Sequence, residues 1–175
     1  MPRVLFIFCL VALTACVPAS RRDYFAVNDI PPAQQISFDG RVGELSYIGE
    51  SENQLVARGA VMVQAFESPP SSLYQFTDRE ALIFVCRSSG RVFQLRLPYT
   101  DAASYGYVTP FGLGFSSSLA DLQAAGLRNV TSEGVQYFSY GYDEANTLMR
   151  DVGFYFSFDE GLGQLTVIDV IAPCS

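Results

Sequence analysis

Carboxylate side chains have the clearest capacity for chemistry in this sequence. They cluster near the C-terminus, at Asp143-Glu144, Asp151 and Asp159-Glu160. Such groups can bind Ca²⁺ through their oxygens or act as a general acid/base pair. However, Asp143-Glu144 and Asp159-Glu160 fall in successive turns, which lie at opposite ends of an antiparallel meander. We therefore interpret these acids as solvated turn residues, and we predict no metal site and no catalytic residue.

The residues that are missing restrict the chemistry further. The sequence has no histidine, and all 11 of its basic residues are arginine. It therefore lacks the usual general base near neutral pH and the amine needed for Schiff-base chemistry. The G-x-G pairs at Gly112 and Gly161 fit turns rather than a nucleotide-binding loop. The sequence predicts a protein without a cofactor that is not an enzyme.

The net charge of the sequence restricts the kinds of partner that it can bind. The sequence carries 18 acidic and 11 basic residues, a formal net charge of −7. Nucleic-acid binding needs clustered basic residues that neutralise phosphates, and anionic lipid attracts basic segments. The composition argues against both, so any attachment to a membrane must come from a separate anchor.

The N-terminus has the pattern of a secretion signal. A single arginine, Arg3, precedes a continuous apolar run from Val4 to Leu13. This run is too short to span a bilayer, which takes about 20 apolar residues. It is typical of the apolar part of a signal peptide, which we place at residues 1–15. Cleavage after Ala19, as in an ordinary secreted protein, is the alternative.

The segment Leu13-Thr14-Ala15-Cys16 resembles the processing site of bacterial lipoproteins. The resemblance implies that Cys16 becomes the first residue of the mature protein and carries a diacylglycerol thioether, usually with an acylated N-terminus. Two or three acyl chains hold a protein stably on a membrane. Because no aspartate follows the cysteine, the sorting rule of the family implies the outer membrane, with the body facing the periplasm. Exposure at the cell surface and secretion are the alternatives.

Two cysteines remain once Cys9 leaves with the signal peptide and Cys16 is lipidated. In an exported protein, Cys86 and Cys174 are then expected to form a disulfide. The alternative is a buried thiol at Cys86 and a free thiol at Cys174.

The remaining pattern divides the chain into a tether and one domain. Residues 16–35 lack periodicity and contain three prolines, so we expect a flexible tether after the lipidated cysteine. Residues 36–175 are expected to form one β-rich globular domain, with a possible sub-boundary at 67–72, where two prolines interrupt the pattern. No sequence repeat of fixed period is visible.

Short apolar runs predict a mainly β fold, a β-rich α+β class built from antiparallel sheets. One short helix is expected near 118–125, with serine before it and Gly126 after it. The last three strands are expected to form a C-terminal meander. The strand candidates are 55–66 (the longest), 81–86, 92–97, 105–115 (with a bulge), 135–142, 152–158 and 164–171.

Aromatic residues mark a candidate interaction surface. Tyr105 and Tyr107 lie in a Gly-rich segment, and Tyr137, Tyr140 and Tyr142 lie in one strand. Alternation places Tyr140 and Tyr142 on one face of that strand and Tyr137 on the other. An exposed tyrosine buries a large ring and keeps its hydroxyl hydrated, which suits protein or glycan contacts. The alternative is that these rings cover the core.

Two features of the body resemble known families. Gly112–Leu122, followed by residues 125–127 and three strands, is similar to helix-plus-antiparallel-sheet domains of the small lipoprotein subunit of the outer-membrane barrel-assembly machine and of β-lactamase-inhibitor-like folds. A strand cysteine, Cys86, with a C-terminal Cys174 resembles the membrane-bound lysozyme inhibitors. Their Ser- and Lys-based inhibitory loop has no counterpart in this lysine-free sequence.

These observations predict a lipid-anchored, non-catalytic envelope lipoprotein that binds or helps assemble other envelope proteins. An exposed Tyr/Phe patch on the C-terminal meander would favour this hypothesis. The second hypothesis is a periplasmic binder or inhibitor of a glycan or secreted enzyme, which a rigid protruding loop, for example around Pro110, would favour. The third is a carboxylate-dependent enzyme, which requires two converging carboxylates in a cleft.

Overall fold

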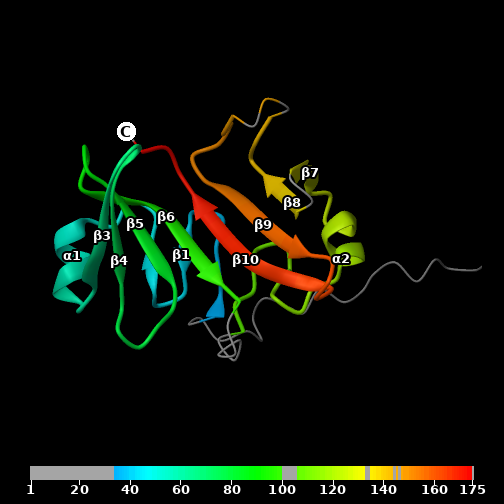
Figure 1. Cartoon of the computed structure of the whole chain (residues 1–175), viewed down its shortest axis with the longest axis horizontal. Helices are drawn as coiled ribbons and strands as arrows, with labels where there is room; N and C mark the ends of the chain where they lie inside the picture. The colour runs from blue at the N-terminus through cyan, green and yellow to red at the C-terminus, as the bar shows by residue number, and fades with distance from the viewer. Residues whose placement is uncertain (1–33, 100–105, 133–134, 144, 146, 175) are drawn as a thin grey trace, which may run out of the picture.

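The computed structural model describes residues 34–99, 106–132, 135–143, 145 and 147–174 (Figure 1). In this part of the chain, eight strands form one antiparallel sheet in the order β3-β4-β5-β6-β10-β9-β8-β7, and β1 and β2 form a small second sheet. The mainly β class predicted from the sequence is confirmed. The elements are β1 (Arg41–Val42), β2 (Ser46–Tyr47), α1 (Glu52–Ala57), β3 (Val61–Glu67), β4 (Pro70–Gln75), β5 (Leu82–Cys86), β6 (Arg91–Pro98), α2 (Leu119–Ala124), β7 (Arg128–Ser132), β8 (Val135–Tyr140), β9 (Gly153–Asp159) and β10 (Gln164–Ile171).

The large sheet consists of two four-stranded meanders that join through β6 and β10. Each meander follows a short helix, because α1 precedes β3–β6 and α2 precedes β7–β10. The two helices lie at opposite ends of the sheet (Figure 1). β6 and β10 are antiparallel neighbours at the centre of the sheet. An approximate two-fold axis normal to the sheet and between them exchanges β6 with β10, β5 with β9, β4 with β8 and β3 with β7. The body is therefore an architectural duplication.

The two helices share the same local sequence signals. In each, the side chain of an N-cap serine accepts a hydrogen bond from a backbone N–H three residues later, and that residue's side chain accepts one from the serine N–H. One leucine in each helix is buried, and a glycine with positive φ follows each helix. The same shift of 67 residues relates Ser51 to Ser118, Gln54 to Asp121, Leu55 to Leu122 and Gly59 to Gly126.

The last hairpins of the two halves also correspond residue by residue. Gly90 in the β5–β6 turn and Gly163 in the β9–β10 turn have φ values of 63° and 68°. Each donates its N–H at 2.8 Å to the carbonyl four residues earlier. A one-residue register shift follows at Phe93 in β6 and at Thr166 in β10. Here the shift between the halves is 73 residues, because the connections between the intervening strands differ in length. The change from 67 to 73 hides the repeat in the sequence.

The predicted strand at residues 55–66 is wrong in its first half. Residues 52–57 form α1, and β3 begins only at Val61. The capping box at Ser51 favours a helix, and Gly59, with φ of 94°, ends it. The expectation of a single helix is corrected for the same reason, since the described residues contain two.

Two other predictions of secondary structure are wrong. Residues 106–115 form turns and one isolated bridge rather than a strand, because the Leu113 N–H donates to Thr109 Oγ1 and closes a tight loop. The predicted three-stranded meander has a fourth strand, β7, whose Arg-Asn-Val-Thr-Ser sequence lacks apolar alternation.

Residues 67–72 form the β3–β4 hairpin inside the sheet. The strands predicted at 81–86, 92–97, 135–142, 152–158 and 164–171 and the helix near 118–125 are confirmed to within two residues.

The core lies between the large sheet and a layer that contains both helices, β1 and β2. Ile83, Leu95, Val170 and Phe154 lie side by side in register across β5, β6, β10 and β9, and all are fully buried. Burial of each such side chain contributes about 1.5–3 kcal/mol. The ring of Phe111 packs 5.5 Å from that of Phe154. The segment around Pro110 is therefore held against the core and does not protrude.

A polar clamp attaches β2 to the end of α1. Glu50 is 2% exposed and accepts hydrogen bonds from Ser46 Oγ at 2.6 Å and from Arg58 Nη2 at 3.1 Å. The same Arg58 nitrogen donates to the Leu45 carbonyl at 2.6 Å. The buried carboxylate is thus paired and hydrogen-bonded, as a charge in a protein interior must be.

Candidate functional site: the outer face of the sheet

The outer face of the large sheet is the face opposite the core. Residues directly opposite in register share a face, so Arg96 on β6, Asp169 on β10, Tyr155 on β9 and Ser139 on β8 form one row there. We name these four residues the polar row. The shift of 73 residues that relates β6 to β10 also relates Arg96 to Asp169. Their pair therefore lies on the approximate two-fold axis, at the centre of the sheet.

The central ion pair is bidentate. Arg96 Nε and Nη2 donate to the two carboxylate oxygens of Asp169 at 2.9 and 3.0 Å, and Gln94 Nε2 donates to Asp169 Oδ1 at 3.0 Å. The hydrogen bond to Asp169 raises the pKa of Arg96, against the opposing effect of burial. Only 6% of the Asp169 side chain is exposed, whereas Arg96 keeps 42%. The buried carboxylate thus fixes a guanidinium that still reaches the surface.

Tyrosines flank this ion pair. The ring centroid of Tyr142 lies 4.4 Å from that of Tyr155. Burial, followed by the proximity of Tyr155 and Asp169, raises the pKa of Tyr142, so its phenol stays protonated at neutral pH. Tyr137 adds a small electrostatic contribution to the raised pKa of Arg96, behind the larger effect of Asp169. The C-terminal half of the outer face is therefore a cluster of half-buried phenols around one fixed cation.

Ser139 is the buried hydroxyl of the polar row. It is 2% exposed, and its Oγ has no hydrogen-bond partner within the part of the chain that the structure describes. A buried polar group without a partner costs about 1–3 kcal/mol. The polar row thus contains one bidentate ion pair and one buried hydroxyl without a partner among the described residues.

The N-terminal half of the outer face is apolar. The ring centroid of Phe84 lies 6.2 Å from that of Phe66 and 6.4 Å from that of Phe93. Leu73, which pairs with Phe84 in register, is 8% exposed. The outer face therefore joins an aromatic half to a polar, tyrosine-rich half.

The structure separates the five tyrosines that the sequence placed on one candidate surface. Tyr137 and Tyr142 lie on the outer face. Tyr140 packs against the core, 4.8 Å from Phe111, and Tyr107 is buried at 6% exposure. Tyr105 lies outside the described residues. Alternation alone would put Tyr142 beside Tyr140, but the strand ends at Tyr140 and Gly141 follows with φ of 88°, so the ring of Tyr142 meets Tyr155 instead.

Sequence reasoning missed Arg96, Asp169 and Gln94. A signal for them exists: Arg96 interrupts Leu-Arg-Leu in β6, and Asp169 interrupts the apolar end of β10. A charge inside a buried strand needs a partner. The sequence does not say which strands are neighbours, so it cannot say that these two residues are partners.

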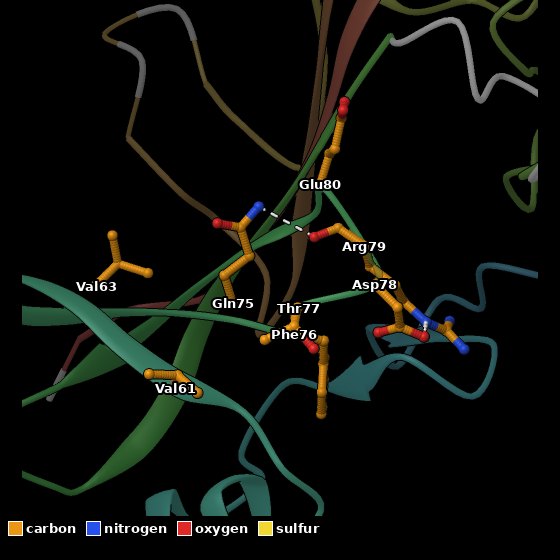
Figure 2. A pocket seen from close by; sticks show the side chains of 8 residues that line it. All are labelled: Val61, Val63, Gln75, Phe76, Thr77, Asp78, Arg79 and Glu80. Atoms are coloured by element: carbon orange, nitrogen blue, oxygen red, sulfur yellow. Dashed lines mark hydrogen bonds and ion pairs between the residues drawn. The ribbon is translucent and has the colours of Figure 1, made fainter.

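A groove lies beside β3, at the free edge of the sheet (Figure 2). Its volume is about 510 Å³. Val61 and Val63 of β3 line one side, and Phe76 and the charged residues 78–80 line the other. Gln75 Nε2 donates to the Arg79 carbonyl at 3.0 Å and holds the β4–β5 connection in place.

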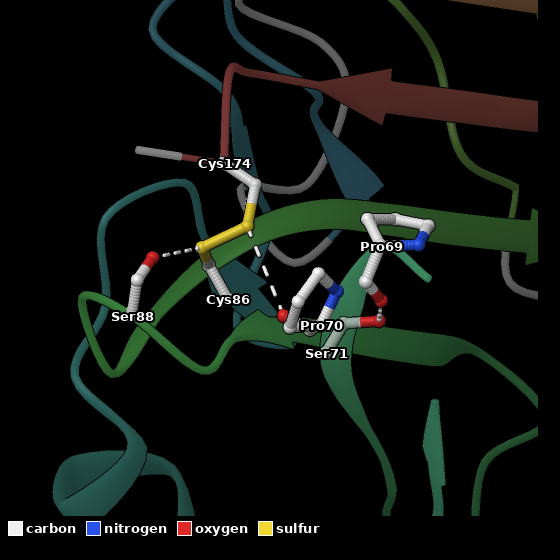
Figure 3. The surroundings of a disulfide bond; sticks show 6 residues. All are labelled: Pro69, Pro70, Ser71, Cys86, Ser88 and Cys174. Atoms are coloured by element: carbon white, nitrogen blue, oxygen red, sulfur yellow. Dashed lines mark hydrogen bonds between the residues drawn. A yellow bond between two sulfur atoms is a disulfide. The ribbon is translucent and has the colours of Figure 1, made fainter. Parts of the chain in front are cut away.

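The structure contains the Cys86–Cys174 disulfide, with Cα atoms 5.3 Å apart (Figure 3). Cys86 ends β5, and Cys174 follows β10, so the bond attaches the C-terminal tail to the N-terminal meander. The Ser88 hydroxyl lies 3.0 Å from Cys86 Sγ. Because both sulfurs are in the bond, neither is available for lipidation or catalysis.

Two of the turn carboxylates, Asp143 and Asp159, hold their own turns, whereas Glu160 accepts a hydrogen bond from Gln136 on β8 and Glu144 lies outside the described residues. Asp143 Oδ1 accepts the Thr147 N–H at 2.8 Å, and Asp159 Oδ1 accepts the Leu162 N–H at 3.0 Å. Among the described residues, no group of three or more His, Cys, Asp or Glu side chains is placed to hold a metal ion. Nor does this part of the chain contain a helix long and apolar enough to cross a membrane. Cys16 lies outside the described residues.

No family model matches the chain, and neither the curated proteins nor the solved structures contain a match to it.

Proposed function

We propose that this protein is a lipid-anchored, non-catalytic component of the bacterial outer membrane that binds another envelope protein through the outer face of its sheet. The fixed guanidinium of Arg96 among half-buried tyrosines carries this proposal. Arginine and tyrosine are enriched among the residues that dominate binding energy at protein interfaces. Because Asp169, which also accepts a hydrogen bond from Gln94, already holds Arg96, little side-chain entropy is lost when a partner binds the guanidinium.

The sequence supports the location of this activity. Leu13-Thr14-Ala15-Cys16 supplies a processing site, and a net charge of −7 leaves the body without electrostatic attraction to anionic lipid. The similarity of residues 112–127 to domains of a barrel-assembly lipoprotein points to the same class, a lipoprotein that works with other envelope proteins. The inhibitor hypothesis receives no comparable support, since the segment around Pro110 packs on the core. Nor does the enzyme hypothesis, since Asp143 and Asp159 each accept a hydrogen bond within their own turn.

Photo-crosslinking in the intact envelope tests the binding surface. We expect a photoreactive phenylalanine analogue in place of Tyr155 to form a discrete adduct with one envelope protein. The same analogue in place of Leu162, which is 63% exposed in the β9–β10 turn, is the control and should give no such adduct. Arg96→Ala should reduce the adduct about tenfold, the equivalent of about 1.4 kcal/mol. The proposed surface is wrong if Tyr155 and Leu162 positions give the same products.

Membrane fractionation tests the anchor separately. We expect Cys16→Ala to move the protein from the membrane fraction to the soluble fraction, because the variant cannot form the thioether. A variant that stays entirely in the membrane fraction would exclude the lipid anchor. That result would leave the binding surface untouched, because crosslinking reports on it independently.

A further inference from the structure

β3 is a free edge of the sheet with an apolar surface. Among the residues that the structure describes, it is the first strand in the order and pairs with β4 on one side only. Val61, Met62 and Val63 are 55%, 54% and 58% exposed, although they are large and apolar. An exposed apolar edge presents unpaired backbone N–H and C=O groups to which another strand can add.

The other edge of the sheet is built differently. β7 has five residues, Arg-Asn-Val-Thr-Ser, whose composition is mostly polar. β3 has seven residues, and its single charge, Glu67, stands at its end. Natural edge strands are commonly protected by charges in mid-strand or by short length. β3 has neither form of protection, and its one irregularity is the register shift at Val63. The edge therefore remains open to contact over most of its length.

The groove beside β3 provides a place for the side chains of an added strand. Its volume of about 510 Å³ falls in the range of about 300–1,000 Å³ that is usual for binding pockets. Val61 and Val63 line it, and Phe76 lies opposite, with the Arg58 guanidinium 5.4 Å from its ring centroid (Figure 2). The register passes from Met62–Tyr74 to Gln64–Leu73, which leaves Val63 without a residue of β4 opposite it.

The charges along the edge of β3 indicate which kind of segment can bind there. Glu67, Asp78 and Glu80 lie along this edge, against Arg79 and Arg87. Arg58 also lies beside the groove, but its charge is neutralised by the ion pair with Glu50. The side chains of Glu67 and Asp78 are 92% and 75% exposed. The three acids outnumber Arg79 and Arg87 by one, and this negative charge adds to the net charge of −7 on the chain. A basic segment is therefore attracted to the edge, whereas a second copy of this acidic chain is repelled.

We propose that β3 binds an extended, basic segment of a partner protein, which adds to the sheet as a ninth strand and places apolar side chains in the groove. This mode of recognition takes its affinity from main-chain hydrogen bonds and its specificity from pockets for alternate side chains. The edge of β3 is separate from the polar row, which lies on β6, β10, β9 and β8. The proposal therefore goes beyond the binding function assigned to the polar row.

Peptide binding to the purified protein tests this inference. The probe is a short fluorescent peptide of alternating lysine and valine. We expect saturable binding by fluorescence anisotropy, with new protection of residues 61–67 in hydrogen–deuterium exchange. Two matched peptides, one with glutamate in place of lysine and one with N-methylated amides along its pairing edge, should each bind at least about tenfold more weakly.

Protein variants locate the site. Val63→Lys places a cation on an exposed position of β3 and should weaken binding of the lysine peptide at least about tenfold. Leu162→Lys adds the same charge to an exposed turn far along the chain and should leave binding unchanged. Equal binding by Val63→Lys and the unmodified protein would overturn the proposal, as would equal binding of the glutamate peptide.

The same preparation distinguishes a second copy of the chain as occupant. We expect a monomer in sedimentation equilibrium over the concentrations used for binding. A concentration-dependent dimer that Val63→Lys abolishes would show that β3 pairs with itself, and the proposed basic partner segment would then be wrong.

Discussion

The two halves of the large sheet have one architecture but different outer surfaces. The register relates Leu73 on β4 to Tyr137 on β8, and Phe84 on β5 to Ser157 on β9. The N-terminal half is apolar at these positions, and the C-terminal half is polar or aromatic with a hydroxyl. The two edge strands also differ. β3 has exposed apolar side chains, whereas β7 is mostly polar in composition.

This difference shows which residues define the architecture. The positions that the halves share are an N-cap serine, one buried leucine, and glycines with positive φ after the helix and in the last hairpin. These residues determine where helices start and end and where strands reverse. Outer-face positions do not affect those events, so they can diverge and carry function. We expect matched substitutions in the two halves to separate the shared architecture from the divergent surface.

The largest effect should come from the bond that joins the halves. The disulfide closes a loop with a sequence separation of 88 residues. In the chain-entropy model, Cys86→Ser with Cys174→Ser should lower the free energy of unfolding by about 4–5 kcal/mol. Urea unfolding measures this loss, and reductant should lower the stability of the unmodified protein but not that of the variant. A loss below about 1 kcal/mol would show that the tail contributes little to the N-terminal half.

The next effect tests the equivalence of the helices. Leu55 and Leu122 are both 0% exposed. Leu55→Ala and Leu122→Ala should each lower the free energy of unfolding by about 3 kcal/mol, because each leaves a cavity in the core. Val56→Ala in α1, at a position that is 50% exposed, is the control and should cost less than about 0.5 kcal/mol. A small loss for one leucine and a large loss for the other would contradict the equivalence.

Two buried serines should respond in opposite directions. Ser46 and Ser139 are each 2% exposed, but Ser46 Oγ donates to Glu50 at 2.6 Å, whereas Ser139 Oγ has no partner among the described residues. Ser46→Ala should cost about 1–3 kcal/mol, because it removes a hydrogen bond to a buried charge. Ser139→Ala should be neutral or stabilising. Thermal and urea unfolding of both variants measure these changes in stability, and a clear loss of stability for Ser139→Ala would contradict the expected difference between the two serines.

The smallest effect is a pH dependence in the N-terminal half. The Tyr74 hydroxyl donates to Glu52, and burial, followed by this hydrogen bond, raises the pKa of Tyr74 from 10.0 to about 12. The folded state therefore holds this proton more tightly than the unfolded chain. The resulting stability is present below pH 10 and is lost as the pH rises towards 12. Tyr74→Phe should cost about 0.5–1.5 kcal/mol at pH 7 and show a smaller decline above pH 10 in urea unfolding. If Tyr74→Phe loses as much stability above pH 10 as the unmodified protein, the loss comes from groups other than Tyr74.

The sequence predicts much of the fold and little of the site. Strands such as β5 and β10 and the helix at 119–124 follow from local patterns of apolar residues, serine and glycine. The apolar pattern does not predict the helix at 52–57, although Ser51 and Gln54 form a capping box, because the apolar residues of the helix continue into β3. Alternation predicts the wrong face for Tyr142, because the strand ends before Gly141, where the chain turns.

By itself, the sequence determined the mainly β class, the pairing of Cys86 with Cys174 as the expected disulfide, and the absence of histidine and lysine. Those properties depend on composition and on local patterns. Only the tertiary structure decided that β6 lies beside β10, which brings Arg96 to Asp169 across 73 residues and creates the polar row. It also decided that β3 ends the sheet with its valines exposed. The order of strands in a sheet depends on contacts between distant segments, and no local pattern in this chain encodes them.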